Sequence, residues 1–147
     1  MYEQLFQLSN LLIMPFWILL ILLPHWRWTG RIISSPWIAA PPALLYAILV
    51  VPGIAGLLAE LANPELTQIA ELLGTAPGAT IAWAHFVTFD LFVGRWVFLD
   101  SRQRRITAWL ASPILFCVLM FGPLGFLLYL LVRVFFAKPT IDQATAA

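Results

Sequence analysis

The sequence predicts an all-α integral membrane protein, built as a four-transmembrane-helix bundle with a short amphipathic surface helix between helices 2 and 3. The residues are 62% hydrophobic and only 10% charged, with a mean hydropathy of +0.92, whereas about 25% of a soluble domain is charged. Four apolar segments can each cross a hydrocarbon core of about 30 Å at about 1.5 Å per residue. They cover residues 5–23, 37–58, 79–99 and 106–136, and we expect a single membrane domain over 1–147.

The first two segments are interpreted as membrane crossings. No basic leader and no small-residue cleavage site precede the first, so we expect no removable signal or transit peptide, as in a bacterial or already processed chain. The second segment is punctuated by Pro41, Pro42 and Pro52. Its alanines at 39, 43 and 47 form a ridge of small residues that favours close packing against a neighbouring helix.

The connection between the second and third segments contains the signals of a short helix. Asn63 is a suitable N-cap, Pro64 suits the first helical position and Gly74 suits the C-cap. Apolar residues between them recur at helical spacing, which predicts an amphipathic helix over about 64–73 that lies flat on the outer surface as a lid or float.

The fourth segment is too long for one straight crossing. It contains Pro113, and then GPLG at residues 122–125. Because proline removes a backbone donor and glycine is flexible, we expect a bend or break near Gly122. The residues after it, 137–147, are expected to form a disordered tail.

Charge in the loops predicts the orientation of the bundle. The first loop carries Arg27 and Arg31 and the third carries Arg102, Arg104 and Arg105, whereas the second has glutamates and no Lys or Arg. The positive-inside rule therefore places loops 1 and 3 in the cytoplasm or stroma and both termini on the opposite side. Five tryptophans flank the two basic loops, as an interfacial aromatic belt would.

The third segment contains HFVTFDLFVGRW at residues 85–96, with three ionisable groups in an apolar stretch. Asp90 is expected about 16 Å from the outer end of the segment, near the bilayer midplane. An ionised carboxylate there costs several kcal/mol, so we expect Asp90 to face the bundle interior as a neutral acid. It is either a functional acid or a structural hydrogen-bonding group between helices. His85, about 9 Å deep, could be an inter-helix donor, a pigment or haem ligand, or a proton relay.

Counting residues from the interfaces predicts two polar layers. Asn10 and His85 form the outer one, and Asp90 and Tyr46 form the central one, with Trp17 as a further candidate at the same level. Gly94 shares a stripe with Asp90 and admits a close neighbour. Arg95 could be an interface anchor or a substrate contact. The candidate catalytic residues are Asp90 and His85, and the candidate substrate-binding residues are Asn10, Trp17, Tyr46, Trp83, Phe86, Phe89 and Arg95.

The inventory of reactive residues excludes several functions. His25 and His85 are expected roughly 20 Å apart across the membrane, too far to share one haem. Cys117 is the only cysteine, which excludes an internal disulfide and a thiol-rich metal site. No P-loop, GxSxG or HExxH motif is present. An enzyme built from these residues would use acid–base chemistry on a lipophilic substrate, with no metal, no soluble cofactor and no nucleic-acid partner.

Two stretches carry a family resemblance: LSNLLIMPFW at 8–17 and AHFVTFDLFVGRWVFLD at 84–100. They resemble the neoxanthin-synthase family, known in plants as the abscisic-acid-deficient membrane proteins and found also in cyanobacteria. The resemblance extends from about Leu5 to Arg133. It implies a small four-helix membrane protein of carotenoid metabolism, in the thylakoid or plasma membrane of a cyanobacterium or in a plastid membrane.

The reaction implied by the resemblance is the isomerisation of violaxanthin to neoxanthin, or of a related carotenoid, in which an epoxide opens and an adjacent allene forms. Asp90 suits the proton donor, with His85, Asn10 or Tyr46 as base or orienting group. These roles follow from the residues, and the resemblance does not supply them. Expected partners are the carotenoid, membrane lipids and a carotenoid-pathway enzyme or photosynthetic complex. The alternative is a non-catalytic pigment-binding or assembly subunit of such a complex, with His85 as axial ligand. A small transporter is a weaker possibility, because the chain lacks repeat symmetry.

Overall fold

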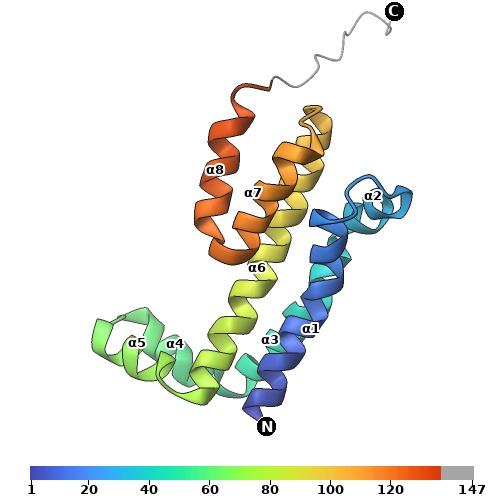
Figure 1. Ribbon diagram of the computed structural model, residues 1–147. Coiled ribbons are helices and arrows are strands. Elements are labelled where there is room, and N and C mark those ends of the chain that lie inside the picture. The colour runs from blue at the N-terminus through green and yellow to red at the C-terminus, as the bar shows by residue number, and fades with distance from the viewer. Residues whose placement is uncertain (137–147) are drawn as a thin grey trace, which may run out of the picture.

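The computed structural model describes residues 1–136, and every regular element in that range is a helix, which confirms the all-helical prediction (Figure 1). The expected disordered tail at 137–147 lies outside the described residues. The elements are α1 (Tyr2–Ile21), α2 (Arg27–Ser34), η1 (Pro36–Ala39), α3 (Ala40–Val50), η2 (Val51–Gly53), α4 (Ile54–Ala62), α5 (Leu66–Leu73), α6 (Ala76–Gln103), α7 (Ala108–Phe121) and α8 (Pro123–Arg133).

Helix α6 is the centre of the fold. It packs against α1, α2, α3, α5, α7 and α8, and its closest association is with α1 (Figure 1). Thr75 begins the helix, because its hydroxyl accepts a hydrogen bond from the Gly78 N–H at 3.1 Å. Every residue that the sequence analysis placed on 79–99 is therefore held on one continuous helix.

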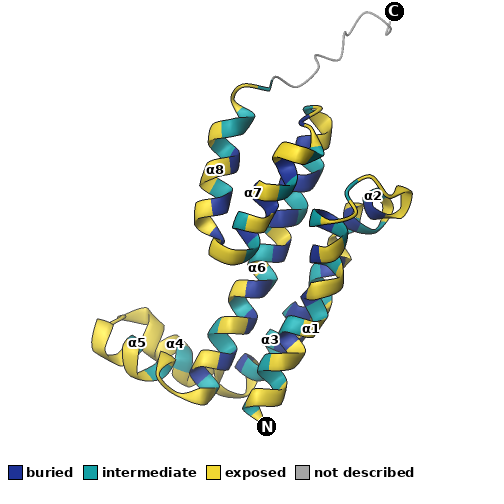
Figure 2. Cartoon of the chain, viewed as in Figure 1, coloured by how far each residue is buried: buried dark blue, intermediate teal, exposed yellow. Residues whose placement is uncertain are grey.

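Three helical stretches are long and apolar enough to cross a membrane: Tyr2–Ile21, Pro36–Ala62 and Ala76–Gln103. They correspond to the first three predicted crossings and are consistent with a membrane protein. The second stretch is packed in the bundle only before η2. After η2, α4 has no buried residue and lies with α5 to one side of the lower end of α6 (Figures 1 and 2).

The predicted surface helix is present as α5, with Gly74 as its C-cap. Its start differs from the prediction, because the N-cap is Glu65, while Asn63 ends α4 and Pro64 precedes the helix. The predicted helix start therefore lies two residues before the observed one.

The fourth predicted crossing is not confirmed. Residues 106–136 form two antiparallel helices, α7 and α8, which we call the hairpin. The helices are about 21 and 16 Å long, so each passes only part of the way along α6. The break falls at Gly122, as predicted, where φ is +40°. A Cβ on Gly125 would lie 2.2 Å from the backbone nitrogen of Val118, so this glycine permits α8 to pack closely on α7.

The hairpin returns the chain to the end of the bundle that it left. An Nη1 of Arg104, just after α6, donates a hydrogen bond to the Phe136 carbonyl at 2.6 Å. Phe136 therefore lies at the same end as the two basic loops, and the N-terminus lies at the other end (Figure 1). The prediction that both termini lie opposite those loops is wrong for the described C-terminal residues. Hydropathy counts apolar residues and does not distinguish a crossing from a return.

Candidate functional site at the tip of the hairpin

Asp90 lies near the midpoint of α6, about 20 Å along the helix axis from each end. Its carboxyl group packs directly against the tip of the hairpin, since a Cβ on Gly122 would lie 2.6 Å from Asp90 Oδ1. Gly122 is therefore required twice at this position, once by its positive φ and once by the space that the carboxyl group occupies. The broken helix and the acid form one site.

No hydrogen bond and no ion pair reaches the Asp90 carboxyl group from any other residue of 1–136. Its side chain is half-buried, between the hairpin tip and the open lower part of α6. A structural carboxyl group between helices would be held by donors from its neighbours. The geometry therefore gives no support to the interpretation of Asp90 as a hydrogen-bonding link between helices.

Exposed aromatic side chains lie on the turn of α6 before Asp90 and beside the hairpin tip. Phe86 and Phe89, in the preceding turn of α6, are 55% and 57% exposed. Phe121, beside the hairpin tip, is 62% exposed. The hairpin lies along only the upper part of α6 (Figure 1), and Phe86 and Phe89 lie below the part that it covers. Asp90 lies at the boundary between the covered and uncovered parts of the helix.

His85 lies among aromatic rings on the side of α6 that faces α3. Its ring centroid is 4.8 Å from that of Phe89, 5.4 Å from that of Tyr46 and 6.1 Å from that of Phe86. Positions five apart on a helix differ by about 140°, so His85 and Asp90 do not share a face. The structure thus brings Tyr46 to His85, whereas the sequence analysis had grouped Tyr46 with Asp90.

Asn10 also has a different neighbour from the predicted one. Its Oδ1 accepts a hydrogen bond from Trp83 Nε1 at 3.0 Å, and its Nδ2 donates to the Phe6 carbonyl. Asn10 therefore links α1 to α6 and is grouped with Trp83, not with His85. Counting residues estimates how deep a side chain lies along the bundle, but it does not show which neighbouring helix the side chain faces.

Trp17 belongs to the core between α1 and α6. It is 1% exposed, and its ring lies over Gly94, where a Cβ would come within 2.5 Å of Trp17 Cη2. This contact confirms that Gly94 admits a close neighbour. The indole Nε1 has no acceptor among the described residues. Trp17 fixes the distance between the two helices one turn beyond Asp90.

Arg95 holds the end of α2. Its guanidinium donates to the carbonyl oxygens of Ser34 and Ser35, the latter at 3.3 Å. The last carbonyls of a helix lack intrahelical partners and accept such bonds readily. In this structure Arg95 acts as an anchor between α6 and α2, and it is directed away from the Asp90 site.

A polar cluster that the sequence analysis did not find lies at the upper end of α6. Asp100 is 6% exposed. It accepts hydrogen bonds from Tyr129 Oη and Arg104 Nε, both at 2.8 Å, and pairs with Arg133 Nε at 3.2 Å. These contacts fasten the end of α8 to α6. The available signals were a single acid beside a basic loop and an arginine at the end of an apolar segment.

The described residues offer little for binding a metal ion. Within 1–136, no three His, Cys, Asp or Glu side chains come together in a way that could hold one. The site therefore consists of a single unpaired carboxyl group, the glycine turn against it, and aromatic rings on the adjacent turn.

Comparison with known proteins gives one match. Residues 4–129 match the model of the family described as ABA DEFICIENT 4-like. No curated protein and no solved structure shows significant similarity to the chain. The match covers most of the sequence, including the helix that carries Asp90 and His85, all of α7 and the first part of α8. The chain therefore belongs to the ABA DEFICIENT 4-like family, which is associated with carotenoid and neoxanthin-related function.

Proposed function

We propose that the chain is an integral membrane enzyme that isomerises an epoxy-carotenoid or a related carotenoid by acid–base chemistry, with Asp90 as the proton donor. The observation that carries the proposal is the carboxyl group halfway along α6 that makes no hydrogen bond or ion pair within residues 1–136 and lies against Gly122. A carboxyl group that is desolvated and unpaired favours its neutral form, and a neutral acid can protonate an epoxide oxygen.

The chemistry is balanced without an oxidant or reductant. The Asp90 proton passes to the epoxide oxygen as its carbon–oxygen bond breaks, and a proton leaves the polyene as the adjacent allene forms. Because His85 lies about 140° around α6 from Asp90, the Asp90 carboxylate left by the first step is the better-placed acceptor. The same side chain thus acts as acid and then as base.

The ligand surface follows from the exposed aromatic residues. A carotenoid is long, flat and dissolved in the hydrocarbon phase, so it can approach from the bilayer. The exposed rings of Phe86 and Phe89 offer apolar contact on the turn next to Asp90. His85 and Tyr46 support these rings from the α3 side.

The charge distribution favours one orientation in the membrane. Six arginines gather at one end of the bundle, which we call the basic end: Arg27, Arg31, Arg102, Arg104, Arg105 and Arg133. By the positive-inside rule this end faces the cytoplasm or stroma and the N-terminus faces the opposite side. The proposed location is a thylakoid, plasma or plastid membrane, where carotenoid-pathway enzymes would be the partners.

The test is pigment analysis after incubating the purified full chain with an epoxy-carotenoid. Asp90→Asn removes the proton while keeping the shape, and the product should fall about 10²- to 10⁴-fold. Glu71→Gln is the matched control, because it removes a carboxylate from exposed α5 and should leave the product unchanged. Full activity of Asp90→Asn would contradict the mechanism.

A second candidate function is a non-catalytic pigment-binding or assembly subunit of a photosynthetic complex. It is favoured by the His85 imidazole, which contacts three aromatic rings and forms no hydrogen bond within residues 1–136. The absorption spectrum of the purified protein distinguishes the two functions. A bound pigment that is lost in His85→Leu, together with unchanged epoxy-carotenoid, would favour the binding subunit. Turnover that survives His85→Leu would favour the enzyme.

A further inference from the structure

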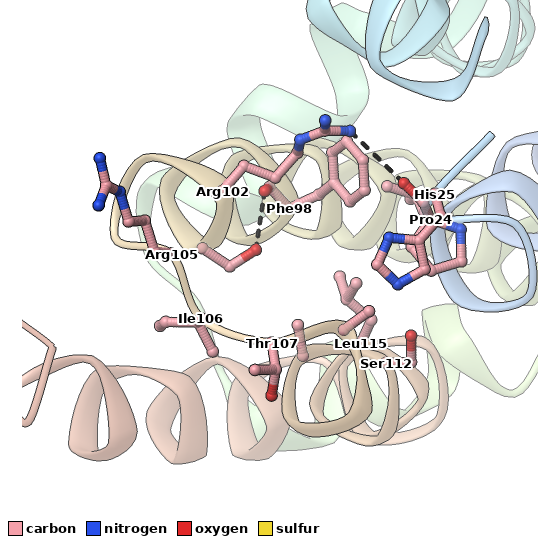
Figure 3. Close-up of a pocket in the computed structure, with 13 residues that line it drawn as sticks. Pro24, His25, Phe98, Arg102, Arg105, Ile106, Thr107, Ser112 and Leu115 are labelled. Atoms are coloured by element: carbon pink, nitrogen blue, oxygen red, sulfur yellow. Dashed lines mark hydrogen bonds between the residues drawn. The ribbon is translucent and has the colours of Figure 1, made fainter. Parts of the chain in front are cut away.

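The basic end contains a pocket that lies well away from Asp90. Its volume is about 250 Å³, and it lies where α1 ends, α6 ends and α7 begins. Figure 3 shows Arg102 along one side and His25 reaching in from the loop after α1. Thr107, which precedes α7, and Ser112, which lies on α7, are opposite. The polar side chains that line it are His25, Ser101, Arg102, Arg105, Thr107 and Ser112.

The positive charge of this pocket is not neutralised within residues 1–136. Asp100, the acid of this end, is engaged by Arg104 and Arg133. Arg102 makes a long hydrogen bond of 3.4 Å to the Pro24 carbonyl and lies over the Phe98 ring. The Arg105 guanidinium makes no hydrogen bond or ion pair with any described residue, although its backbone N–H donates to the Arg102 carbonyl at 3.1 Å. A concave surface with two such guanidinium groups attracts an anion.

Hydrogen-bond donors in the pocket are also without partners. The side chains of His25, Thr107 and Ser112 form no hydrogen bonds with other residues of 1–136. An imidazole can donate an N–H in either protonation state, and a hydroxyl can always donate. Helix α7 begins at the pocket wall, and Thr107 does not cap it with its side chain. The first amides of α7 thus add to the attraction for an anion.

An apolar groove continues from this pocket along α7. Its volume is about 610 Å³, and it shares Pro24, His25, Ala108 and Ser112 with the pocket. Beyond these residues it is lined by Ile21, Leu22, Trp109, Pro113, Phe116 and Cys117. Trp109 at its mouth is 92% exposed, which suits a ring at a membrane interface. The cationic pocket, with its hydrogen-bond donors, thus opens directly into the apolar groove.

We propose that the pocket and groove together bind one anionic membrane lipid. Its phosphate group would lie near His25 and Arg102, with Arg105 at the outer edge of the pocket (Figure 3), and one acyl chain would follow the groove beside Phe116. Basic pockets between membrane helices on the cytoplasmic side suit acidic lipid headgroups. The proposal depends on the membrane location given above and is independent of the chemistry at Asp90.

The test is a native mass-spectrometry titration of the purified full chain with phosphatidylglycerol and with phosphatidylcholine of identical acyl chains. The wild-type protein should bind phosphatidylglycerol at least about five-fold more tightly. His25→Gln and Arg105→Gln should each lower that preference several-fold; both side chains are exposed, so the fold should be kept. Arg31→Gln is the control, since it removes the same charge from the basic end outside the pocket and groove.

Three results would overturn the proposal. Equal affinity for the two lipids would show that no anion site exists. An equal loss in Arg31→Gln and Arg105→Gln would show diffuse surface attraction. Full competition by glycerol phosphate would show that the site takes a soluble anion, not a lipid. Because none of these variants touches Asp90, epoxy-carotenoid turnover should continue in them, which separates failure of this proposal from failure of the proposed enzyme function.

Discussion

Asp90 and Asp100 are two carboxylates on the same helix, and they have opposite surroundings. They lie about 15 Å apart along α6, and α8 runs between them, because it starts beside Asp90 and ends beside Asp100. Asp100 is contacted by Tyr129, Arg104 and Arg133. The Asp90 carboxyl group accepts no hydrogen bond from any residue of 1–136. The paired acid holds the hairpin in place, and the unpaired acid remains available for chemistry.

The difference bears on why each residue is there. Burying a polar group without a hydrogen bond costs free energy, and burying a charge without a partner costs more. Within residues 1–136, Asp100 offsets that cost by accepting hydrogen bonds from Tyr129 and Arg104 and by pairing with Arg133. Asp90 recovers nothing from its described neighbours, so its presence in an apolar helix is better explained by a reaction or ligand than by stability.

Replacing Asp100 should have the largest effect on stability. Asp100→Asn removes the charge that Arg104 and Arg133 share, and leaves two guanidinium groups at a largely buried position. We expect the free energy of unfolding to fall by about 3 kcal/mol. Denaturation in mixed detergent, followed by circular dichroism, measures it. A change no larger than that of Glu71→Gln would show that the cluster does not hold the hairpin.

Replacing Gly122 should have the next largest effect. Gly122→Ala places a Cβ at a positive φ and 2.6 Å from Asp90 Oδ1, and should cost about 2 kcal/mol. Combining it with Asp90→Ala removes the clash but keeps the backbone strain. The double variant should therefore lose less unfolding free energy than the two single variants lose in total, by at least about 0.5 kcal/mol. Strict additivity would mean that the carboxyl group does not lie against the tip.

Tyr129→Phe tests one donor of the Asp100 cluster alone. Tyr129 is fully buried, and its hydroxyl donates to Asp100 Oδ2 at 2.8 Å. Loss of one hydrogen bond to a charged acceptor should cost about 1.5 kcal/mol. The same unfolding measurement applies. A stability equal to that of the wild type would show that the Tyr129 hydroxyl does not stabilise the cluster.

Asp90→Asn should have the smallest effect on stability, within about 0.5 kcal/mol, because no described residue pairs with this carboxyl group. It should nevertheless lower turnover about 10²- to 10⁴-fold, whereas the main effect of Asp100→Asn should be on stability. Unfolding and pigment conversion should be measured on the same preparation. A loss of stability as large as that of Asp100→Asn would show that Asp90 is a structural residue.

Much of the fold could be predicted from the sequence, because local signals determine it. The apolar runs placed α1 and α6 within a few residues of their observed bounds, and Gly74 ended the surface helix as expected. The glycine and proline at 122 and 123 marked the break in the last segment. These features depend on residues that are close together in the sequence, so one sequence is enough to predict them.

Features that depend on long-range contacts could not be predicted in the same way. Residue counting gives depth and not direction, so it grouped Tyr46 with Asp90 where the structure brings it to His85. Asp100 is separated from Arg133 by a whole hairpin, and only a chain that reverses at Gly122 brings them together. The Asp100 cluster could not be predicted because the sequence analysis did not predict the reversed direction of α8.

The most direct test of this account asks on which side of the membrane α8 ends. In a Cys117→Ser background, single cysteines at Arg105, Val134 and Glu65 would be labelled with a membrane-impermeant maleimide in oriented vesicles. The hairpin predicts that the cysteines at 105 and 134 are labelled from one side and the cysteine at 65 from the other. Labelling of positions 105 and 134 from opposite sides would establish a fourth crossing, separate Asp100 from Arg133 and contradict the site described at Gly122.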